Sequence, residues 1–342
     1  MTMKSGKRIT LRDLAADLGI HHSTVSRALK NDSRITQTLK AKVKEAALRL
    51  GYKPDPMLSA LMAYRSDNQA KKNKGTLAWL TNYPTREGWR EFQNIGYYEG
   101  ASRRAAELGY SIDEIWMREP SITPTRLTQI LLSRNIRGVL IPPVPRARAR
   151  VKLNWDEFAA VTYGTTIFWP ALHTVDCDHF HCMSLLLRKL KKLGYTRPGF
   201  VCLTRTHESI DRTWAAAFMA FRPEKSASNI PMFINRKLDF KGFAAWFEKH
   251  QPDVVIAHLA VVADWLRKLG LKIPRDVGFA LAARHHAVPR LSGVDERSES
   301  IGESGVDILV KMIERGERGI PSKRSITLLQ GEFVEGKTLR KL

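Results

Sequence analysis

Two short amphipathic segments joined by a glycine turn lie near the start of the chain and restrict what this region can fold into. Apolar residues repeat at three- and four-residue steps from Leu11 to Leu18, so a short helix has one apolar face, and Gly19 ends it. From His22 a second segment places apolar residues inward and polar residues outward. Its inward residues are Val25, Ala28 and Leu29. Two such helices form a helix-turn-helix, whose second helix lies in the major groove of DNA.

A third helix and an apolar segment are predicted next. Thr36 can cap a helix that runs to about Leu50, and Gly51 ends it. Its apolar stripe is Val43, Ala46, Ala47 and Leu50. Residues 52–56 contain two prolines, and the apolar residues that follow are far too few to span a membrane. They therefore need a partner that buries them, and we assign a hinge helix to about residues 56–64.

This stretch resembles the DNA-binding headpiece of the lactose/galactose-repressor family (LacI/GalR). The matching residues are Ile9-Thr10-Leu11, Asp13-Leu14-Ala15, Gly19-Ile20, Ser23-Thr24-Val25-Ser26-Arg27, Leu29, Asn31, Gly51-Tyr52, Pro54 and Leu61. The resemblance implies a headpiece over residues 1–64. It also implies a homodimeric, sequence-specific transcription regulator, expected to be a repressor, that binds an approximately palindromic operator.

The resemblance also assigns roles at the DNA. Three residues of the second helix are expected to read bases: His22, Ser23 and Arg27. Arginine suits guanine, and serine can donate or accept at several base edges. For His22, a solvated residue at the helix start stays an alternative. Thr24 and Ser26 are expected to hold phosphates, and Leu61 to wedge into the minor groove, with interdomain packing as its alternative.

The charge balance agrees with a nucleic-acid partner. The chain has 56 Lys+Arg against 34 Asp+Glu, which gives +22; residues 1–74 hold 16 and 6 of these, hence +10, and leave +12 for the rest. A basic headpiece neutralises phosphates. The basic remainder either adds non-specific affinity for nucleic acid or reflects the general composition of the host's proteins. With no secretory signal or membrane span in the sequence, we expect a cytoplasmic, nucleoid-associated protein.

The remainder of the chain predicts a two-lobed α/β body. Residues 65–75 are polar and read as a linker, and strands alternate with helices over residues 76–342. Such succession implies two doubly wound lobes of parallel sheet, with a ligand cleft where the carboxyl ends of their strands face each other. The sequence Gly194-Tyr195-x-x-Pro198-Gly199-Phe200 resembles the repressor family too, and that family shares its layout with periplasmic sugar-binding proteins.

The cleft departs from the family pattern. Sugar-responsive members usually carry Asn-Asp where this chain has His258-Leu259, and a Tyr-Asp-Asp-like turn where it has Ala282-Ala283-Arg284. Arg212 matches the family's cleft arginine, and Asp178 fits its lobe-crossing aspartate. Arg pairs with carboxylate or phosphate, and His258 could add positive charge. Arg212, Arg284 and His258 therefore predict an anionic effector, such as a sugar acid or phosphorylated sugar, in a cleft that also contains Asp178. The alternatives are a vestigial cleft in a ligand-independent or protein-controlled DNA binder and, argued against by the headpiece, a solute-binding protein.

Metal binding and catalysis receive less support. Four residues of metal-ligating type lie close together: Cys177, His179, His181 and Cys182. They stand at a predicted strand-to-helix turn, where we expect them to fan outward, so no metal site is predicted. The three cysteines of the chain include no C-x-x-C pair, which fits a reducing compartment. No nucleophile-elbow, phosphate-loop, zinc-protease or dinucleotide motif is present, so neither an enzyme nor a cofactor is expected.

Overall fold

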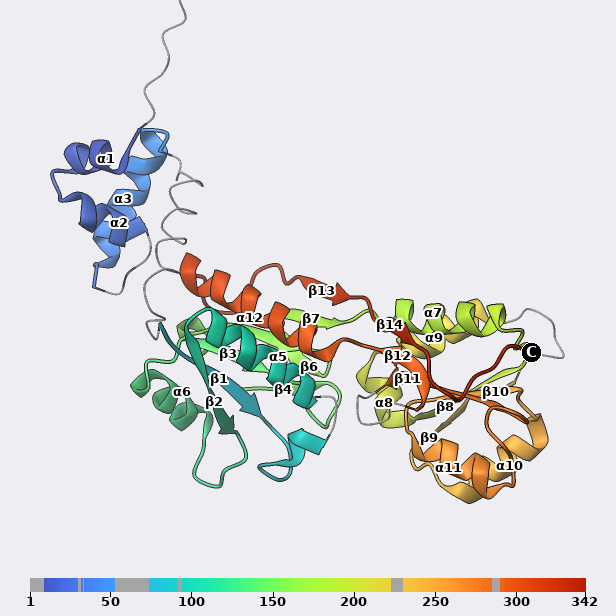
Figure 1. Cartoon of the computed structure of the whole chain (residues 1–342). Helices are drawn as coiled ribbons and strands as arrows, with labels where there is room; N and C mark the ends of the chain where they lie inside the picture. The colour runs from blue at the N-terminus through green and yellow to red at the C-terminus, as the bar shows by residue number, and fades with distance from the viewer. Residues whose placement is uncertain are drawn as a thin grey trace, which may run out of the picture.

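The computed structural model describes residues 9–29, 32, 34–52, 74–91, 94–222, 230–284 and 290–342. The N-terminal unit is three helices around a small core (Figure 1). They are α1 (Leu11–Leu18), α2 (His22–Leu29) and α3 (Gln37–Arg49). Thr10 and Asp13 form a capping box at the start of α1, and Gly19 ends that helix in the left-handed conformation. The fully buried side chains are Leu14, Val25, Ala28 and Val43. The predicted helix-turn-helix and third helix are confirmed. The hinge helix with Leu61 lies outside the described residues, as does most of the linker.

The first lobe of the body is a six-stranded parallel sheet in the order β13-β7-β5-β3-β1-β2. Its strands are β1 (Gly75–Thr81), β2 (Tyr110–Trp116), β3 (Gly138–Ile141), β5 (Ala159–Tyr163), β7 (His173–Cys177) and β13 (Ile326–Leu329). A two-stranded pair, β4 (Ala149–Arg150) with β6 (Ile167–Trp169), lies beside it. The helices of this lobe are α5 (Asn94–Glu107), α6 (Pro124–Ser133) and α12 (Ser298–Arg315), with short 3-10 turns at Gly88–Glu91 and Trp155–Glu157.

The second lobe is also a six-stranded sheet, in the order β14-β12-β11-β10-β8-β9, and only β14 runs antiparallel. Its strands are β8 (Pro198–Leu203), β9 (Phe233–Asn235), β10 (Val254–Ala257), β11 (Gly278–Arg284), β12 (Ser292–Asp295) and β14 (Glu332–Val334). Its helices are α7 (His179–Lys192), α8 (Thr204–Ser209), α9 (Thr213–Phe221), α10 (Phe240–His250) and α11 (Val261–Lys268). Near-continuous apolar runs in β8, β10 and β11 follow from burial on both faces of a parallel sheet. The predicted two-lobed α/β body is confirmed.

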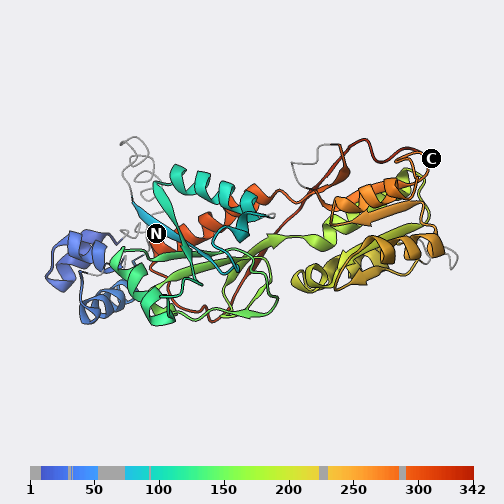
Figure 2. The same cartoon turned by 90° about the horizontal axis from the view of Figure 1, so that it is seen from below.

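The chain crosses between the lobes three times within the described residues. The crossings join β7 to α7, β12 to α12, and β13 to β14. Figure 2 shows these connecting segments passing between the two lobes. Each lobe is therefore built from separate stretches of sequence. In particular, α12 follows the second lobe in sequence but packs in the first.

A close helix pair explains why α12 belongs to the first lobe. A side chain at Gly100 on α5 would overlap the backbone carbonyl of Glu299, and one at Gly302 on α12 would overlap that of Tyr97. The Tyr163 hydroxyl donates to the Gly302 carbonyl oxygen at 2.9 Å. Glycine thus permits the backbone approach that places α12 against α5 and the sheet. No helix in the described part of the chain is long and apolar enough to cross a membrane.

Candidate DNA-binding surface and effector cleft

The outward face of α2 carries the residues predicted to contact DNA. His22 and Arg27 are exposed, while the three hydroxyl residues between them, Ser23, Thr24 and Ser26, are partly buried. His21 directly precedes the helix: its carbonyl oxygen accepts from the backbone N–H of Thr24, and its Nδ1 lies 2.8 Å from the Ser23 hydroxyl oxygen. The Ser23 hydroxyl therefore already has a partner in the free protein. The exposure of α2 fits the predicted roles, which stay predictions.

A second arginine lies just beyond the recognition helix. The Arg34 guanidinium donates to both carboxylate oxygens of Asp32, at 3.0 and 2.7 Å, and remains 71% exposed. This pairing, with a smaller contribution from the charge of Arg27, holds the pKa of Asp32 well below its usual range. The Asp32 backbone N–H donates to the Arg27 carbonyl oxygen at 3.0 Å, so the loop folds back on the end of α2. Arg34 was not among the residues predicted to contact DNA. Its position directly after a polar loop, next to the second helix, is the sequence feature that could have indicated it.

A cavity of about 320 Å³ lies between the lobes, at the carboxyl ends of strands from both sheets. The wall from the first lobe consists of Tyr83, Pro143, Val144, Pro145 and Thr166. The opposite wall consists of Leu203, Arg205, Thr206, Ser209, Trp214, His258, Leu259 and Ala283. The Thr165 hydroxyl donates to the Ser209 carbonyl oxygen at 2.7 Å, which links the lobes beside the cavity. The position agrees with the predicted cleft.

His258 lines this cavity as a neutral group. Burial, with a smaller contribution from the charge of Arg205, lowers its pKa to about 4, although the Val201 carbonyl acts in the opposite direction. The prediction that His258 adds positive charge is therefore wrong at neutral pH. Neither ring nitrogen of His258 makes a hydrogen bond of normal geometry, and the same holds for Trp214 Nε1. Both residues line the cavity, but these nitrogen atoms are themselves buried.

Two family models match the chain. The model described as "Bacterial regulatory proteins, lacI family" matches residues 10–55, and the model described as "Periplasmic binding protein-like domain" matches residues 187–338. The HTH-type transcriptional regulator GntR of Escherichia coli (strain K12) is 24% identical over 92% of this chain and 95% of GntR. The chain is a LacI-family DNA-binding transcription regulator.

Solved structures share the fold of this LacI-family regulator. A transcriptional regulator CelR–cellobiose complex is 18% identical, with a TM-score of 0.55, and the match covers 97% of this chain and 100% of that one. A lac repressor dimer bound to operator and the anti-inducer ONPF is 15% identical, with a TM-score of 0.55, over 97% and 99% of the two chains. The resemblance predicted from sequence is confirmed.

In this LacI-family regulator, one of the four predicted effector residues lines the described cavity, and that residue is His258. Arg212 lies at the start of α9 with an exposed side chain and a left-handed backbone. Arg284 donates Nε–H to the Leu291 carbonyl oxygen at 3.0 Å, and Asp178 caps α7 through the His181 backbone at 2.9 Å. Effector roles for these three residues remain predictions. Arg205, which the sequence analysis did not name, is the cation in the cavity wall.

One prediction is wrong at the lobe crossing. Cys177, His179 and Cys182 do not fan outward, because the last residue of β7 and the first turn of α7 face the same buried junction. There they meet Glu296 from the crossing that leads to α12. His181 is not part of this group.

Proposed function

We propose that this regulator is a repressor that binds an approximately palindromic operator as a homodimer and responds to an anionic small molecule in the cleft. The exposed face of α2, with Arg27 and His22, carries the DNA-binding part of the proposal. A symmetric dimer places two such helices on two half-sites, so the operator should share the two-fold symmetry of the protein. Because its target is chromosomal DNA, we place the protein in the cytoplasm, on the nucleoid.

The charge of the cavity wall supports an anionic effector. Arg205 is its cation, and no Asp or Glu lies among the described lining residues. Tyr83 and Trp214 supply aromatic surface for a sugar ring, and the hydroxyl residues Thr166, Thr206 and Ser209 are among the lining residues. A sugar acid or phosphorylated sugar combines both requirements. The CelR structure with cellobiose and the lac repressor structure with ONPF show small molecules bound to proteins of this fold.

Selection of DNA from a random duplex pool with the full chain tests the DNA-binding function. We expect recovered sequences to share an inverted repeat, and mass measurement of the complex to give two chains per duplex. The selected operator is then titrated with matched neutral and anionic sugars, glucose against glucuronate and glucose 6-phosphate. A change in operator affinity with an anionic sugar, and not with glucose, supports the effector assignment. An asymmetric consensus bound by one chain contradicts the dimer, and an affinity that no sugar changes favours the ligand-independent alternative.

A further inference from the structure

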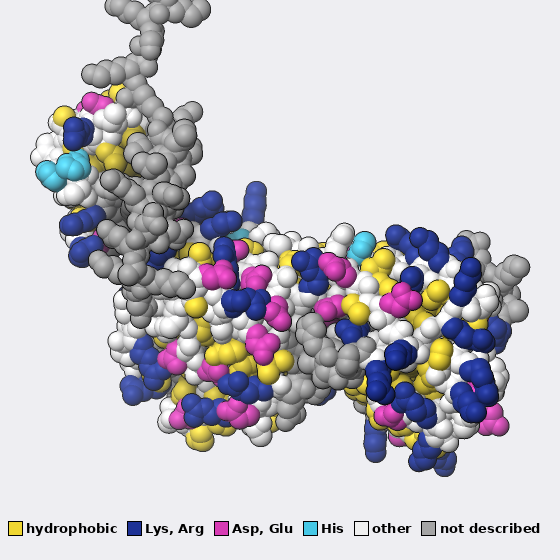
Figure 3. Space-filling view, in the orientation of Figure 1, with side chains coloured by type: hydrophobic (Ala, Val, Ile, Leu, Met, Phe, Trp, Pro, Cys, Tyr) yellow, Lys and Arg dark blue, Asp and Glu magenta, His cyan; other side chains and the backbone are white. Residues whose placement is uncertain are grey.

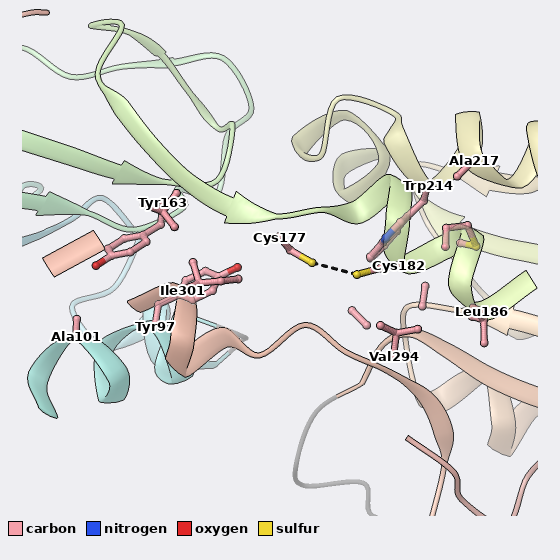
Figure 4. Close-up of a cluster of buried hydrophobic side chains, with 14 of the residues drawn as sticks. Tyr97, Ala101, Tyr163, Cys177, Cys182, Leu186, Trp214, Ala217, Val294 and Ile301 are labelled. Atoms are coloured by element: carbon pink, nitrogen blue, oxygen red, sulfur yellow. Dashed lines mark hydrogen bonds between the residues drawn. The ribbon is translucent and has the colours of Figure 1, made fainter. Parts of the chain in front are cut away.

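A buried group of chemically reactive side chains lies outside the cavity, where the lobe crossings meet. Cys177, His179 and Cys182 belong to the β7–α7 crossing, and Glu296 belongs to the β12–α12 crossing. The third crossing is in contact as well, because a side chain at Gly331 would meet Cys182 Sγ at 2.8 Å. Figure 4 shows Cys177 and Cys182 pointing toward each other at this junction, beside Trp214. None of these four residues is among the described residues that line the cavity.

The donor atoms of this group lie at distances suited to one metal ion. One ligand atom each from Cys177, His179 and Glu296 lies within 4.8 Å of the other two. The Cys177 and Cys182 sulfur atoms are 3.3 Å apart. Ligand atoms of a tetrahedral zinc ion lie roughly 3.3–3.8 Å from each other, given bonds of about 2.0–2.3 Å. The donors of Cys177, His179 and Glu296 therefore lie close to the spacing of one ion, and Cys182, beside Cys177, is the nearest candidate for a fourth ligand.

Two carboxyl groups are buried at this junction, and one of them has no hydrogen bond. Glu296 and Asp176 are 3% and 4% exposed, and His179 is the only cationic group that pairs with either carboxylate in the described part of the chain. Both oxygens of Glu296 lack a hydrogen bond; His179 Nδ1 approaches Oε1 to 2.9 Å, but without hydrogen-bond geometry. A buried carboxylate oxygen without a hydrogen bond is costly, and coordination to a metal ion gives the Glu296 oxygen a partner.

We propose that Cys177, Cys182, His179 and Glu296 bind a Zn²⁺ ion at the junction of the lobes. Two thiolates, an imidazole and a carboxylate in a tetrahedral arrangement favour Zn²⁺ over the oxygen-preferring Mg²⁺ and Ca²⁺. With Nδ1 of His179 on the metal, its Nε2 faces Asp176 Oδ1, 3.5 Å away. A carboxylate on the far nitrogen is the usual partner of a metal-bound histidine, and it fixes the ring orientation.

Zinc in this position joins two of the three crossings. The ligands on the β7–α7 crossing leave the first lobe, and Glu296 lies on the return crossing to that lobe. The ion therefore fixes the spacing of the crossings about which the lobes would rotate. This inference does not depend on the operator or on the effector.

The test loads the full-length protein with metal under reducing conditions. The protein is stripped with a chelator, given Zn²⁺, desalted and analysed by elemental mass spectrometry. We expect one zinc per chain in the parent, and a content near zero in Cys177→Ser and Glu296→Gln. Cys202→Ser and His181→Asn serve as matched controls with ligand types outside the group, and should retain one zinc.

Cobalt binding provides a second measurement, which tests the site in the parent protein itself. Co²⁺ in the parent protein should give a thiolate-to-cobalt charge-transfer band, which Cys177→Ser removes while circular dichroism confirms its fold. Absence of that band in the folded parent overturns the proposal, and leaves the cluster as an ion pair of His179 with its carboxylates. Zinc retained equally by the parent and by Cys177→Ser overturns it too.

Discussion

Arg205 is the residue on which the effector proposal depends most directly. It is the one arginine or lysine among the described residues of the cavity wall. A hydrogen bond to a charged group contributes about 1.5–3 kcal/mol, so Arg205→Ala should weaken binding of an anionic sugar roughly 10- to 100-fold. Lys249→Ala is the control, since that side chain is exposed at the end of α10, outside the described wall. Calorimetric titration measures both, and a neutral sugar that binds the Arg205→Ala protein as well as the parent contradicts the anionic assignment.

His258 makes stability depend on pH in a defined window. Its pKa is about 4 in the folded protein and 6.5 without burial. The unfolded chain therefore binds a proton between these values while the native state does not, and stability falls as pH falls through this window. Between pH 7 and pH 5 we expect a loss of about 1–2 kcal/mol from this group. Urea unfolding at both pH values should show a smaller loss in His258→Gln than in the parent. Equal losses would remove His258 as the cause.

Arg27 should determine sequence preference more than total affinity. A bidentate contact with a base contributes roughly 1–3 kcal/mol of discrimination. Arg27→Ala should therefore reduce the free-energy difference between operator and random DNA by about this amount, and so lower the ratio of specific to random affinity. Arg12→Ala, on the exposed face of α1, should leave the ratio unchanged, since a phosphate contact weakens all sequences alike. Fluorescence anisotropy with the selected operator and a scrambled duplex gives the ratio. The same ratio in Arg27→Ala and the parent would show that another residue reads the base.

The sequence predicts individual residues unevenly. The outward direction of His22 and Arg27 follows from helical periodicity, because the inward positions must be apolar. Arg284 also follows a predicted strand, but its guanidinium donates to the Leu291 carbonyl, a long-range contact that no local pattern contains. Convergence of His179 with Glu296 likewise depends on crossings more than one hundred residues apart.

At the scale of elements, the pair α5–α12 depends on glycine at the contact. Gly302→Ala would place a methyl group against the Tyr97 carbonyl, so we expect a loss of roughly 1–3 kcal/mol from overpacking, despite the better helix propensity of alanine. Gly242→Ala on α10 is the control, because its methyl group meets side-chain atoms and not backbone, namely Phe233 Cζ at 3.3 Å and Asp239 Oδ1 at 3.4 Å. Chemical unfolding compares the two variants. If Gly302→Ala is as stable as the parent, α5 and α12 are further apart than described.

Glycine also explains why the sequence pattern does not predict α12. Caps and glycine stops predict α1, α2 and α3 closely, because those signals are local. Residues 298–315 contain Gly302 and Gly305, which weaken a helix in isolation, and the sequence analysis assigns no helix there. Packing against α5 and against Tyr163 stabilises α12 instead. Tertiary contacts thus override the local preference.

For the whole molecule, a ligand that fills the cavity must contact both lobes. The walls come from both sheets, so binding should slow amide exchange on the two sides together, around Val144 and Thr166 in the first lobe and around His258 in the second. At a ligand concentration 100 times the Kd, the body should gain about 2.7 kcal/mol against unfolding. Hydrogen–deuterium exchange with and without the active sugar measures this. Protection confined to one lobe would mean that the ligand does not bridge the cleft.

The first lobe can be completed only late in synthesis, because the chain returns to it near its end. The three helices over residues 9–52 have their own core, so they can fold soon after leaving the ribosome. The first lobe must wait for α12 and β13, which are synthesised after most of the second lobe. A late premature stop codon therefore deprives the first lobe of its covering helix as well as truncating the second. Its product is a headpiece able to fold, attached to a body with no complete lobe.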